Sequence, residues 1–248
     1  MNAKDIVVSD YKLKYLFYGA GGTGKTKAIR TAPTPIYTFA FDDGLLTNRG
    51  WDIEFDTFTD DVAKGKIVKS AMVKAENKLK ELEDNCPYAT VVLDNLSSLE
   101  EFAVNYTAQL NKHTMIEWQD WGGATNIVRD WLFRLLKLPC IKIIIAHEAM
   151  VKDEVQGDFR IMPAICGKKL PPKLVNLFDE AYRFTADRST AGESEYIIRT
   201  SAAKRFQAKT RLDELEGSVT WTNKELFKDL LTPAEESANT KEAKDGKK

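Results

Sequence analysis

Short apolar runs alternate with longer amphipathic segments over the first 150 residues of the chain. The runs are Tyr15–Tyr18, Ile36–Phe41, Thr90–Leu93 and Ile141–Ala146, and their composition is typical of strands that are buried in a sheet. Between them, the segments 67–84, 97–110 and 124–136 repeat apolar residues at helical spacing. This alternation predicts an α/β domain with a mostly parallel central sheet and helices on both faces.

The pattern loosens after Glu148. Residues 150–172, MVKDEVQGDFRIMPAICGKKLPP, read as a long polar loop, followed by a short helix and two strand-like runs near Ala181–Thr185 and Tyr196–Thr200. The end of the chain from Pro233 has almost no apolar residues, so it cannot bury enough surface to become ordered. We therefore expect one domain over residues 1–232 and a disordered charged tail over 233–248.

Charge and cysteine content exclude several classes of protein. The chain has 248 residues with 36 Lys and Arg against 37 Asp and Glu, so its net charge of -1 attracts no polyanion as a whole. The three cysteines, Cys86, Cys140 and Cys166, lack metal-site spacing and suit a reducing compartment. No run approaches the roughly 20 apolar residues of a membrane span. These features favour a soluble cytoplasmic protein with no membrane partner.

The sequence GAGGTGKT matches the phosphate-binding pattern G-x-x-x-x-G-K-[ST] at every fixed position. Its residues are Gly19, Ala20, Gly21, Gly22, Thr23, Gly24, Lys25 and Thr26. The apolar run YLFY precedes the loop and a helix-compatible segment follows it, as this chemistry requires. The motif predicts ATP binding, with Lys25 on the β- and γ-phosphates and Thr26 on Mg²⁺. The alternative is a glycine-rich turn that only caps a helix.

Asp94 ends the apolar run TVVLD and is a second candidate ligand of Mg²⁺. A carboxylate at such a strand end can hold the ion through water, opposite Thr26. Asp is also common as a helix N-cap, which gives a purely structural alternative. Ser97 looks the better cap for the helix that follows, and this leaves Asp94 for the metal.

Five fragments in a fixed order extend the likeness beyond the loop. GAGGTGKT, FAFDDG, VVLDNLSSLEE, IIIAHE and AKTR, between Tyr15 and Arg211, resemble RecA-like P-loop ATPases that phages encode beside single-strand-binding proteins, the Sak-type single-strand annealing group. The resemblance implies a RecA-like fold and ATP-linked handling of single-stranded DNA in phage recombination. It also implies a bacterial host cytoplasm as the location and a single-strand-binding protein as a possible partner.

The resemblance assigns two further residues to the ATP site. Asn95 follows Asp94, where AAA+ and many helicase families place a catalytic Glu, so the base must come from elsewhere. RecA-like proteins carry it at the tip of the second core strand, which corresponds to Asp43, with Asp42 beside it; RecA itself uses the longer Glu. The same comparison makes His147 a sensor of the γ-phosphate. There are structural alternatives for both residues. Asp42 to Gly44 could simply form a turn, and His147 could be a hydrogen-bonded polar group at a strand end with no role in the site.

Lys209 and Arg211 match a Lys-x-Arg pair that hexameric RecA-like proteins such as KaiC and DnaB project into the neighbouring subunit's ATP site. The resemblance therefore implies a homo-oligomer, as a ring or a filament, in which Arg211 acts as a finger in trans. A solvated basic turn is the alternative. DNA in RecA-like recombinases is held after the sensor strand, where this chain has Lys152, Arg160, Lys168, Lys169 and Lys173.

Two other functions remain open. An ATP-switched loader or assembly module of a phage replication or recombination complex would use the same nucleotide site to change partners. A small-molecule kinase would need an Arg-rich lid, and no later segment resembles one. Stimulation of ATP hydrolysis by single-stranded DNA would separate the recombination function from both.

Replacing Lys25 by Ala should abolish ATP turnover, because the β- and γ-phosphates lose their fixed cation. Phosphate release from the purified variant, compared with the unmodified chain, measures the effect. Turnover close to that of the unmodified chain would show that GAGGTGKT is not the working site.

Overall fold

The structure is a computed structural model that describes residues 11–63, 66–152, 157–165, 174–188, 194–212, 218–221 and 226–227. The tail predicted for 233–248 lies outside the described residues, and so do Cys166, Lys168, Lys169 and Lys173. In the part of the chain that is described, no helix has the length and apolar character needed to cross a membrane.

Strands and helices alternate through the first two thirds of the chain, and strands dominate the last third. The helices are α1 (Lys25–Ala28), α2 (Ala71–Asp84), α3 (Leu96–Leu110) and α4 (Trp118–Leu135), with 3-10 turns η3 (Ile29–Thr31), η4 (Asp43–Asn48) and η5 (Val175–Leu177). The strands are β1 (Lys14–Gly19), β2 (Ile36–Ala40), β3 (Glu54–Thr57), β4 (Asp61–Ala63), β5 (Lys66–Lys69), β6 (Thr90–Asp94), β7 (Ile141–Lys152), β8 (Phe159–Pro163), β9 (Glu180–Arg188), β10 (Ser194–Arg199) and β11 (Ser218–Trp221).

The described strands form a central sheet in the order β11-β10-β9-β1-β7-β6-β2-β3, with β8 beside β7. The six strands from β9 to β3 are parallel, whereas β10, β11 and β8 pair in antiparallel fashion. The predicted mostly parallel sheet is confirmed. Because parallel strands end at the same edge, β1, β2, β6 and β7 bring their carboxyl ends together there.

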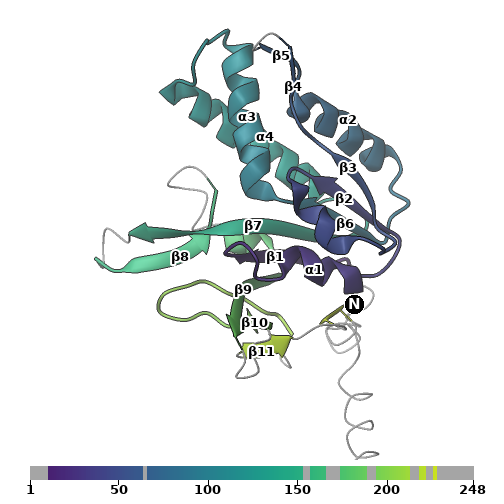
Figure 1. The fold of residues 1–248 in the computed structure, drawn as a ribbon, viewed down its shortest axis with the longest axis vertical. Helices are drawn as coiled ribbons and strands as arrows, with labels where there is room; N and C mark the ends of the chain where they lie inside the picture. The colour runs from purple at the N-terminus through teal and green to yellow at the C-terminus, as the bar shows by residue number, and fades with distance from the viewer. Residues whose placement is uncertain are drawn as a thin grey trace, which may run out of the picture.

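Both faces of the sheet are covered, as predicted. Helices α2, α3 and α4 stand on one face, where Phe39, Leu93 and Trp131 belong to one buried cluster, and Figure 1 shows these helices on one side of the strands. A second cluster, which includes Phe17 and Ile143, packs against Ile29 at the end of α1. Burial of these aromatic and β-branched side chains provides the main favourable free energy of folding.

Helix starts differ from the sequence prediction. The helix expected over 67–84 begins at Ala71, because Lys66–Lys69 pairs with β4 and the side chain of Ser70 caps the helix by accepting the Met72 N–H. The helix expected from 124 begins at Trp118, ahead of two glycines. Both differences reflect capping side chains and strand pairing, which apolar periodicity alone does not report.

The cap of α3 was also predicted wrongly. Asn95, not Ser97, is its N-cap, and the Asn95 side chain accepts the Ser98 N–H at 2.8 Å. Ser97 Oγ instead donates to the backbone oxygen of Ala164 at 2.7 Å. The polar stretch 150–172 is not a simple loop, since its first part continues β7 and turns back as β8. Figure 1 shows this β7–β8 hairpin projecting from the body of the molecule.

Candidate functional site

The phosphate-binding loop joins the end of β1 to the start of α1. Lys25 is buried at 6% exposure, and its Nζ donates to the backbone oxygens of Gly19 at 2.9 Å and Ala20 at 2.7 Å. Burial lowers the pKa of Lys25, while the nearby carboxylates of Asp94, Glu148 and Asp42 act in the opposite direction. The lysine therefore lies inside the loop that the motif predicts it to serve.

Close packing makes glycine necessary at two positions of the loop. A Cβ atom on Gly19 would lie 2.2 Å from the backbone oxygen of Phe184 on β9. Gly24 has φ +86°, and a Cβ there would lie 2.9 Å from the ring of Tyr196 on β10. A side chain at either position would collide with its neighbour, and at Gly24 it would also strain the backbone. Strands β9 and β10 thus form one wall of the loop.

Asp94 and Thr26 meet at the opposite side of the loop. Thr26 Oγ1 donates to Asp94 Oδ2 at 2.8 Å, which joins the first turn of α1 to the end of β6. Asn95 Nδ2 donates to Asp42 Oδ2, so the carboxylate that follows β2 belongs to the same cluster. Asp94 is not the helix cap, and the structural alternative for this residue does not apply.

Burial raises the pKa of Asp94 to about 7, and the negative charge of Asp42 contributes to the increase. The hydrogen bond from Thr26 and the charge of Lys25 oppose this shift. A hydroxyl and two carboxylates in this arrangement are hard oxygen ligands of the kind that Mg²⁺ binds. Among the described residues, no three His, Cys, Asp or Glu side chains gather as a complete metal site.

Asp42 and Asp43 lie in different surroundings. Asp42 is the N-cap of η4, where its Oδ1 accepts the Gly44 N–H at 2.9 Å, and it lines the pocket above the loop. Asp43 is exposed and lines only the neighbouring pocket. The sequence assigns the base to Asp43, whereas the structure brings Asp42 to the phosphate-binding loop. Both residues follow β2, and the turn of the chain decides which carboxylate faces the loop.

His147 pairs with Gly19 in the register of β7 and β1, so it lies beside the start of the loop. Its Nε2 is 3.4 Å from Asn95 Nδ2, and its side chain is exposed towards the pocket. The sensor role of His147 stays a prediction. The position of the histidine brings it into contact with the residue that binds Asp42.

We call the cavity above the loop the phosphate pocket; its volume is about 270 Å³. Its lining consists of Gly21, Gly22, Thr23, Gly24, Lys25, Thr26, Lys27, Asp42, Gly44, Thr47, Asp94, Asn95, Ile145, His147 and Tyr196. The sequence prediction missed Tyr196, because no local pattern reports that a distant hairpin folds over the loop. It also missed Asn95 and Lys27, although their positions next to Asp94 and Thr26 give a usable signal.

Lys209 and Arg211 are not brought together with the phosphate pocket of their own chain. Lys209 Nζ donates to the backbone oxygen of Phe178 at 2.7 Å, and Arg211 forms a 2.9 Å ion pair with Asp179. Asp179 precedes β9 at the amino-terminal edge of the sheet, opposite the edge where the loop lies. Burial lowers the pKa of Lys209. Either residue could act as a finger only at the phosphate pocket of another copy of the chain.

The chain resembles one protein family and a number of solved structures. The family described as AAA domain matches residues 11–212, and no curated protein matches the chain. A KaiC-like protein from Pyrococcus horikoshii OT3 is 12% identical, with a TM-score of 0.45 over 85% of this chain and 90% of that one. The flagellar accessory protein FlaH from Methanocaldococcus jannaschii is 8% identical, with a TM-score of 0.36 and coverage of 86% and 91%. A type III secretion ATPase of pathogenic bacteria is 12% identical, with a TM-score of 0.39 and coverage of 70% and 52%.

The family match extends over more than half of the chain. It includes the loop Gly19 to Thr26, the Thr26–Asp94 pair and His147. The chain therefore belongs to the AAA domain family of P-loop ATPases.

Proposed function

We propose that the chain hydrolyses ATP with Mg²⁺ and couples this reaction to the binding of single-stranded DNA by the β7–β8 hairpin. The observation that carries the proposal is the position of His147. It lines the phosphate pocket, and it belongs to the same strand that continues into the projecting hairpin. Loss of the γ-phosphate on hydrolysis could therefore affect the hairpin through the backbone of β7 and through hydrogen bonds near His147.

The residues of the pocket divide the hydrolytic step among them. Lys25 would neutralise the β- and γ-phosphates, and Thr26 with Asp94 would hold Mg²⁺, which when bound would supply further positive charge to the phosphate oxygens. Asp42 orients a water molecule for attack on the γ-phosphorus and accepts its proton, while the bond to the β-phosphate oxygen breaks and ADP leaves. Asn95 positions Asp42 through the hydrogen bond from its Nδ2.

Three hydrogen bonds join the phosphate pocket to the base of the hairpin. The His147 N–H donates to Ser97 Oγ at 3.2 Å, and Ser97 Oγ donates to the Ala164 oxygen at 2.7 Å. The Ala164 N–H in turn donates to the His147 oxygen at 2.7 Å. Ala164 directly follows β8, so both strands of the hairpin are fixed to the segment that carries His147. This closed network supports coupling between ATP and the hairpin.

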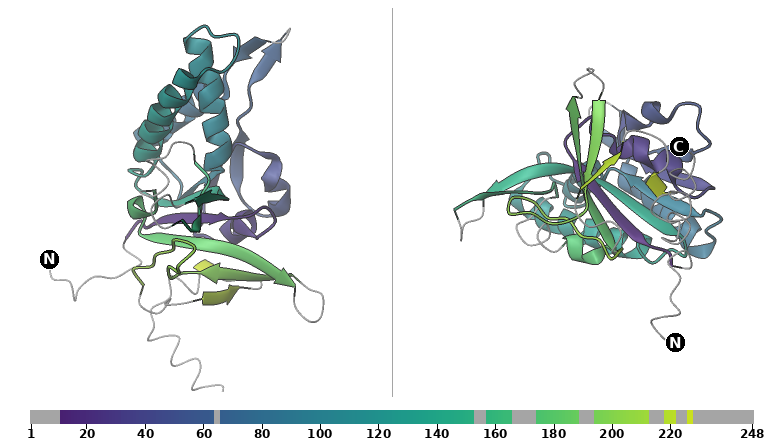
Figure 2. Two further views of the ribbon diagram at one scale, coloured as in Figure 1. Left: turned by 90° about the vertical axis from the view of Figure 1, so that its left-hand side faces the viewer. Right: turned by 90° about the horizontal axis from the view of Figure 1, so that it is seen from below.

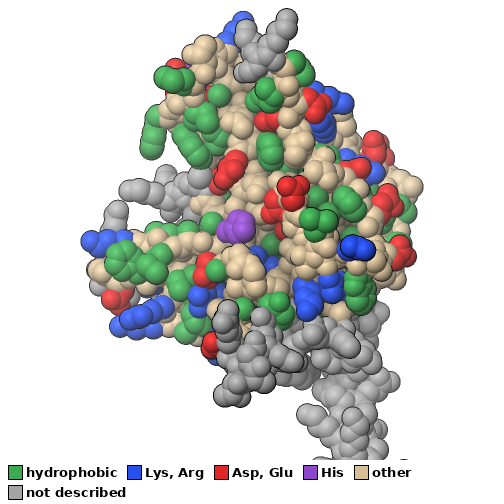
Figure 3. All heavy atoms as spheres, in the orientation of Figure 1, with side chains coloured by type: hydrophobic (Ala, Val, Ile, Leu, Met, Phe, Trp, Pro, Cys, Tyr) green, Lys and Arg blue, Asp and Glu red, His purple; other side chains and the backbone are tan. Residues whose placement is uncertain are grey.

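The hairpin offers groups that suit a single strand of DNA. Phe159 is 54% exposed and can stack on a base, and Lys152, Arg160, Lys204 and Arg205 lie on or beside the hairpin. Figure 3 shows Lys and Arg side chains together with apolar ones on this projection. Cations near an exposed aromatic ring are the combination that non-specific single-strand binding uses. Of the five Lys and Arg residues that the sequence places where DNA would be held, only Lys152 and Arg160 lie within the described residues.

On this proposal the chain acts in phage recombination, as its Sak-type resemblance implies, in the cytoplasm of a bacterial host and beside a single-strand-binding protein. It works as a homo-oligomer in which Lys209 and Arg211 act on the neighbouring copy. Their distance from the phosphate pocket of their own chain supports a role in trans. Asp179, which pairs with Arg211 here, would have to release it.

An ATP-switched loader is the second candidate function. The exposed apolar side chains of Met150 and Val151 on the same hairpin favour it, because they suit a protein partner better than a charged phosphate backbone. The loader would use the same coupling through His147. DNA dependence distinguishes the two functions.

Asp42→Asn should retain ATP binding and lose hydrolysis by about 100-fold or more, because the amide keeps the size of the side chain but cannot accept the proton. Asp43→Asn is the matched control, and it should hydrolyse ATP at nearly the normal rate. Single-turnover phosphate release with separately measured nucleotide affinity gives both values. If Asp43→Asn instead loses hydrolysis and Asp42→Asn hydrolyses ATP at nearly the normal rate, Asp43 is the catalytic base.

Mg²⁺ affinity in the presence of ADP should depend on pH through Asp94. Its pKa is raised to about 7, so below that pH the carboxyl is protonated and must release its proton to bind the ion. Affinity should fall about tenfold per pH unit below 7 and level off above it. Calorimetric titration at several pH values measures the slope. Asp94→Asn should bind weakly with no such slope; an unchanged slope would assign the titration to another group.

ATP turnover with and without oligo(dT) tests the coupling. Turnover should rise on addition of DNA, and Phe159→Ser should weaken both DNA binding and stimulation, since base stacking on an aromatic ring contributes about 1–3 kcal/mol per base. Phe133→Ser, at an exposed aromatic on α4, is the matched control and should behave like the unmodified chain. If the chain does not bind DNA and its ATP turnover does not change when DNA is added, the loader function is favoured over this one.

A further inference from the structure

A group of exposed apolar side chains lies at the connection between α3 and α4. We call it the apolar knob; it consists of Leu110, Met115, Ile116, Trp118 and Trp121. Trp118 is 91% exposed and Met115 is 78% exposed. Figures 1 and 2 show this connection at the end of the two helices that is farthest from the central sheet. Large side chains of this kind are costly to leave in water unless they meet a partner.

The knob is held in a fixed shape by a buried carboxylate. Asp120, which is fully buried, accepts hydrogen bonds from Asn111 Nδ2 at 2.7 Å, His113 Nδ1 at 2.9 Å and the Glu117 N–H at 2.8 Å. These bonds fix the turn and form a capping box at the start of α4. The apolar side chains are therefore presented by an ordered turn. Less conformational entropy is lost when such a turn binds a partner than when a flexible segment does.

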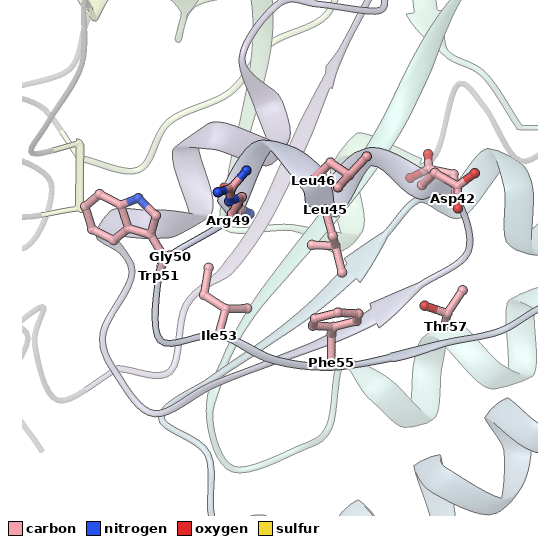
Figure 4. Close-up of a pocket in the computed structure, with 11 residues that line it drawn as sticks. Asp42, Leu45, Leu46, Arg49, Gly50, Trp51, Ile53, Phe55 and Thr57 are labelled. Atoms are coloured by element: carbon pink, nitrogen blue, oxygen red, sulfur yellow. The ribbon is translucent and has the colours of Figure 1, made fainter.

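A second apolar feature lies at the edge of the central sheet beside β3. We call it the apolar pocket; it has a volume of about 560 Å³ between η4 and the segment that leads into β3. Its lining consists of Asp42, Asp43, Leu45, Leu46, Asn48, Arg49, Gly50, Trp51, Ile53, Phe55 and Thr57. Figure 4 shows Leu45 facing Ile53 and Phe55 across the pocket. Leu46 is 81% exposed and belongs to its rim.

We propose that the apolar knob of one copy of this chain docks into the apolar pocket of a second copy. The pocket has a volume typical of sites that enclose a bulky group, and tryptophan and methionine are enriched where proteins bind one another. Both rims carry charges of both signs, Glu117 and Lys112 near the knob and Arg49 and Asp43 on the pocket, so opposite charges can pair across the contact.

The contact joins different surfaces of the two copies. The knob is at the outer end of the helices and the pocket is at the edge of the sheet beside β3, so each copy has one free knob and one free pocket after pairing. Such a head-to-tail contact produces a ring if it closes and a filament if it does not. The inference deepens the homo-oligomer of the proposed function and supplies its interface.

The apolar pocket is also connected to the phosphate pocket. Asp42 lines both, and η4 places Gly44 and Thr47 on the phosphate pocket and Leu45 and Leu46 on the apolar pocket. Arg30, next to α1, binds Asn48 of η4 through its Nε at 3.0 Å. A neighbouring knob that fixes η4 therefore also fixes Asp42. Docking should strengthen nucleotide binding by the same factor by which nucleotide strengthens docking.

Two exposed residues allow a crossed test that spares the core. Trp118→Asp removes the knob and leaves the pocket, whereas Leu46→Asp spoils the pocket and leaves the knob. Analytical ultracentrifugation with Mg²⁺ and a slowly hydrolysed ATP analogue should show assemblies larger than dimers for the unmodified chain and monomers for either variant alone. An equimolar mixture of the variants should form one-to-one dimers and nothing larger, because it contains a single complete knob and pocket pair.

Val73→Asp, at an exposed apolar position on α2, is the matched control and should assemble normally. Three outcomes would overturn the proposal: an unmodified chain that stays monomeric with nucleotide, a variant that still assembles alone, or a mixture that stays monomeric. Binding of oligo(dT) and of a fluorescent ATP analogue to the unmodified chain, measured on the same samples, reports separately on the proposed function. Loss of assembly with a far-UV circular dichroism spectrum like that of the unmodified chain distinguishes a failed interface from a misfolded chain.

Discussion

The hydrogen bond between Thr26 and Asp94 is the contact on which the arrangement of the site depends. It joins the first turn of α1 to the end of β6. Asn95, the next residue, extends the contact to Asp42 after β2 and to His147 on β7. Four separate elements are thereby held around one loop, and each contributes a polar group to the phosphate pocket. This is possible because the parallel strands end at a common edge of the sheet.

Burial of Asp94 beside the half-buried carboxylate of Asp42 makes this contact sensitive to its ligands. Because the pKa of Asp94 is raised to about 7, the folded chain retains a proton that the unfolded chain would release above a pH of about 4. The stability associated with that proton is present at low pH and is lost as pH rises through 7. A bound cation would offset the repulsion between Asp94 and Asp42, so metal and nucleotide should stabilise the fold as well as the site.

The strongest parts of the site could be predicted from local sequence. The glycine-rich loop and the carboxylate that ends an apolar strand are adjacent to clear structural signals, and the structure places them as expected. The choice between Asp42 and Asp43 depends on a cap contact to Gly44, which the sequence does not report. The contribution of Tyr196 depends on how a distant antiparallel hairpin folds back over Gly24. Such contacts follow from tertiary packing rather than from periodicity.

A different limit applies to the segment after His147 and to the late basic pair. Polar residues in the segment did not indicate the strand pairing of the β7–β8 hairpin, since only the end of β8 at Met162 and Pro163 is buried and a stretch that short shows no period of two. Lys209 and Arg211 matched a motif, but they lie at the far edge of the sheet. The match to a short motif identifies these two residues but does not predict how far they lie from the phosphate pocket. That distance depends on the pairing of Lys209 with Ala181, which is a tertiary contact.

We propose that Thr26, Asp94 and the loop form a single site for a metal-bound nucleotide. Electron paramagnetic resonance of Mn²⁺, used in place of Mg²⁺ with ADP, tests it most directly. The unmodified chain should bind Mn²⁺ and ADP together, and Thr26→Val should release the metal while ADP alone still binds, because the substitution removes only the hydroxyl. Equal retention of Mn²⁺ by the two proteins would contradict the account.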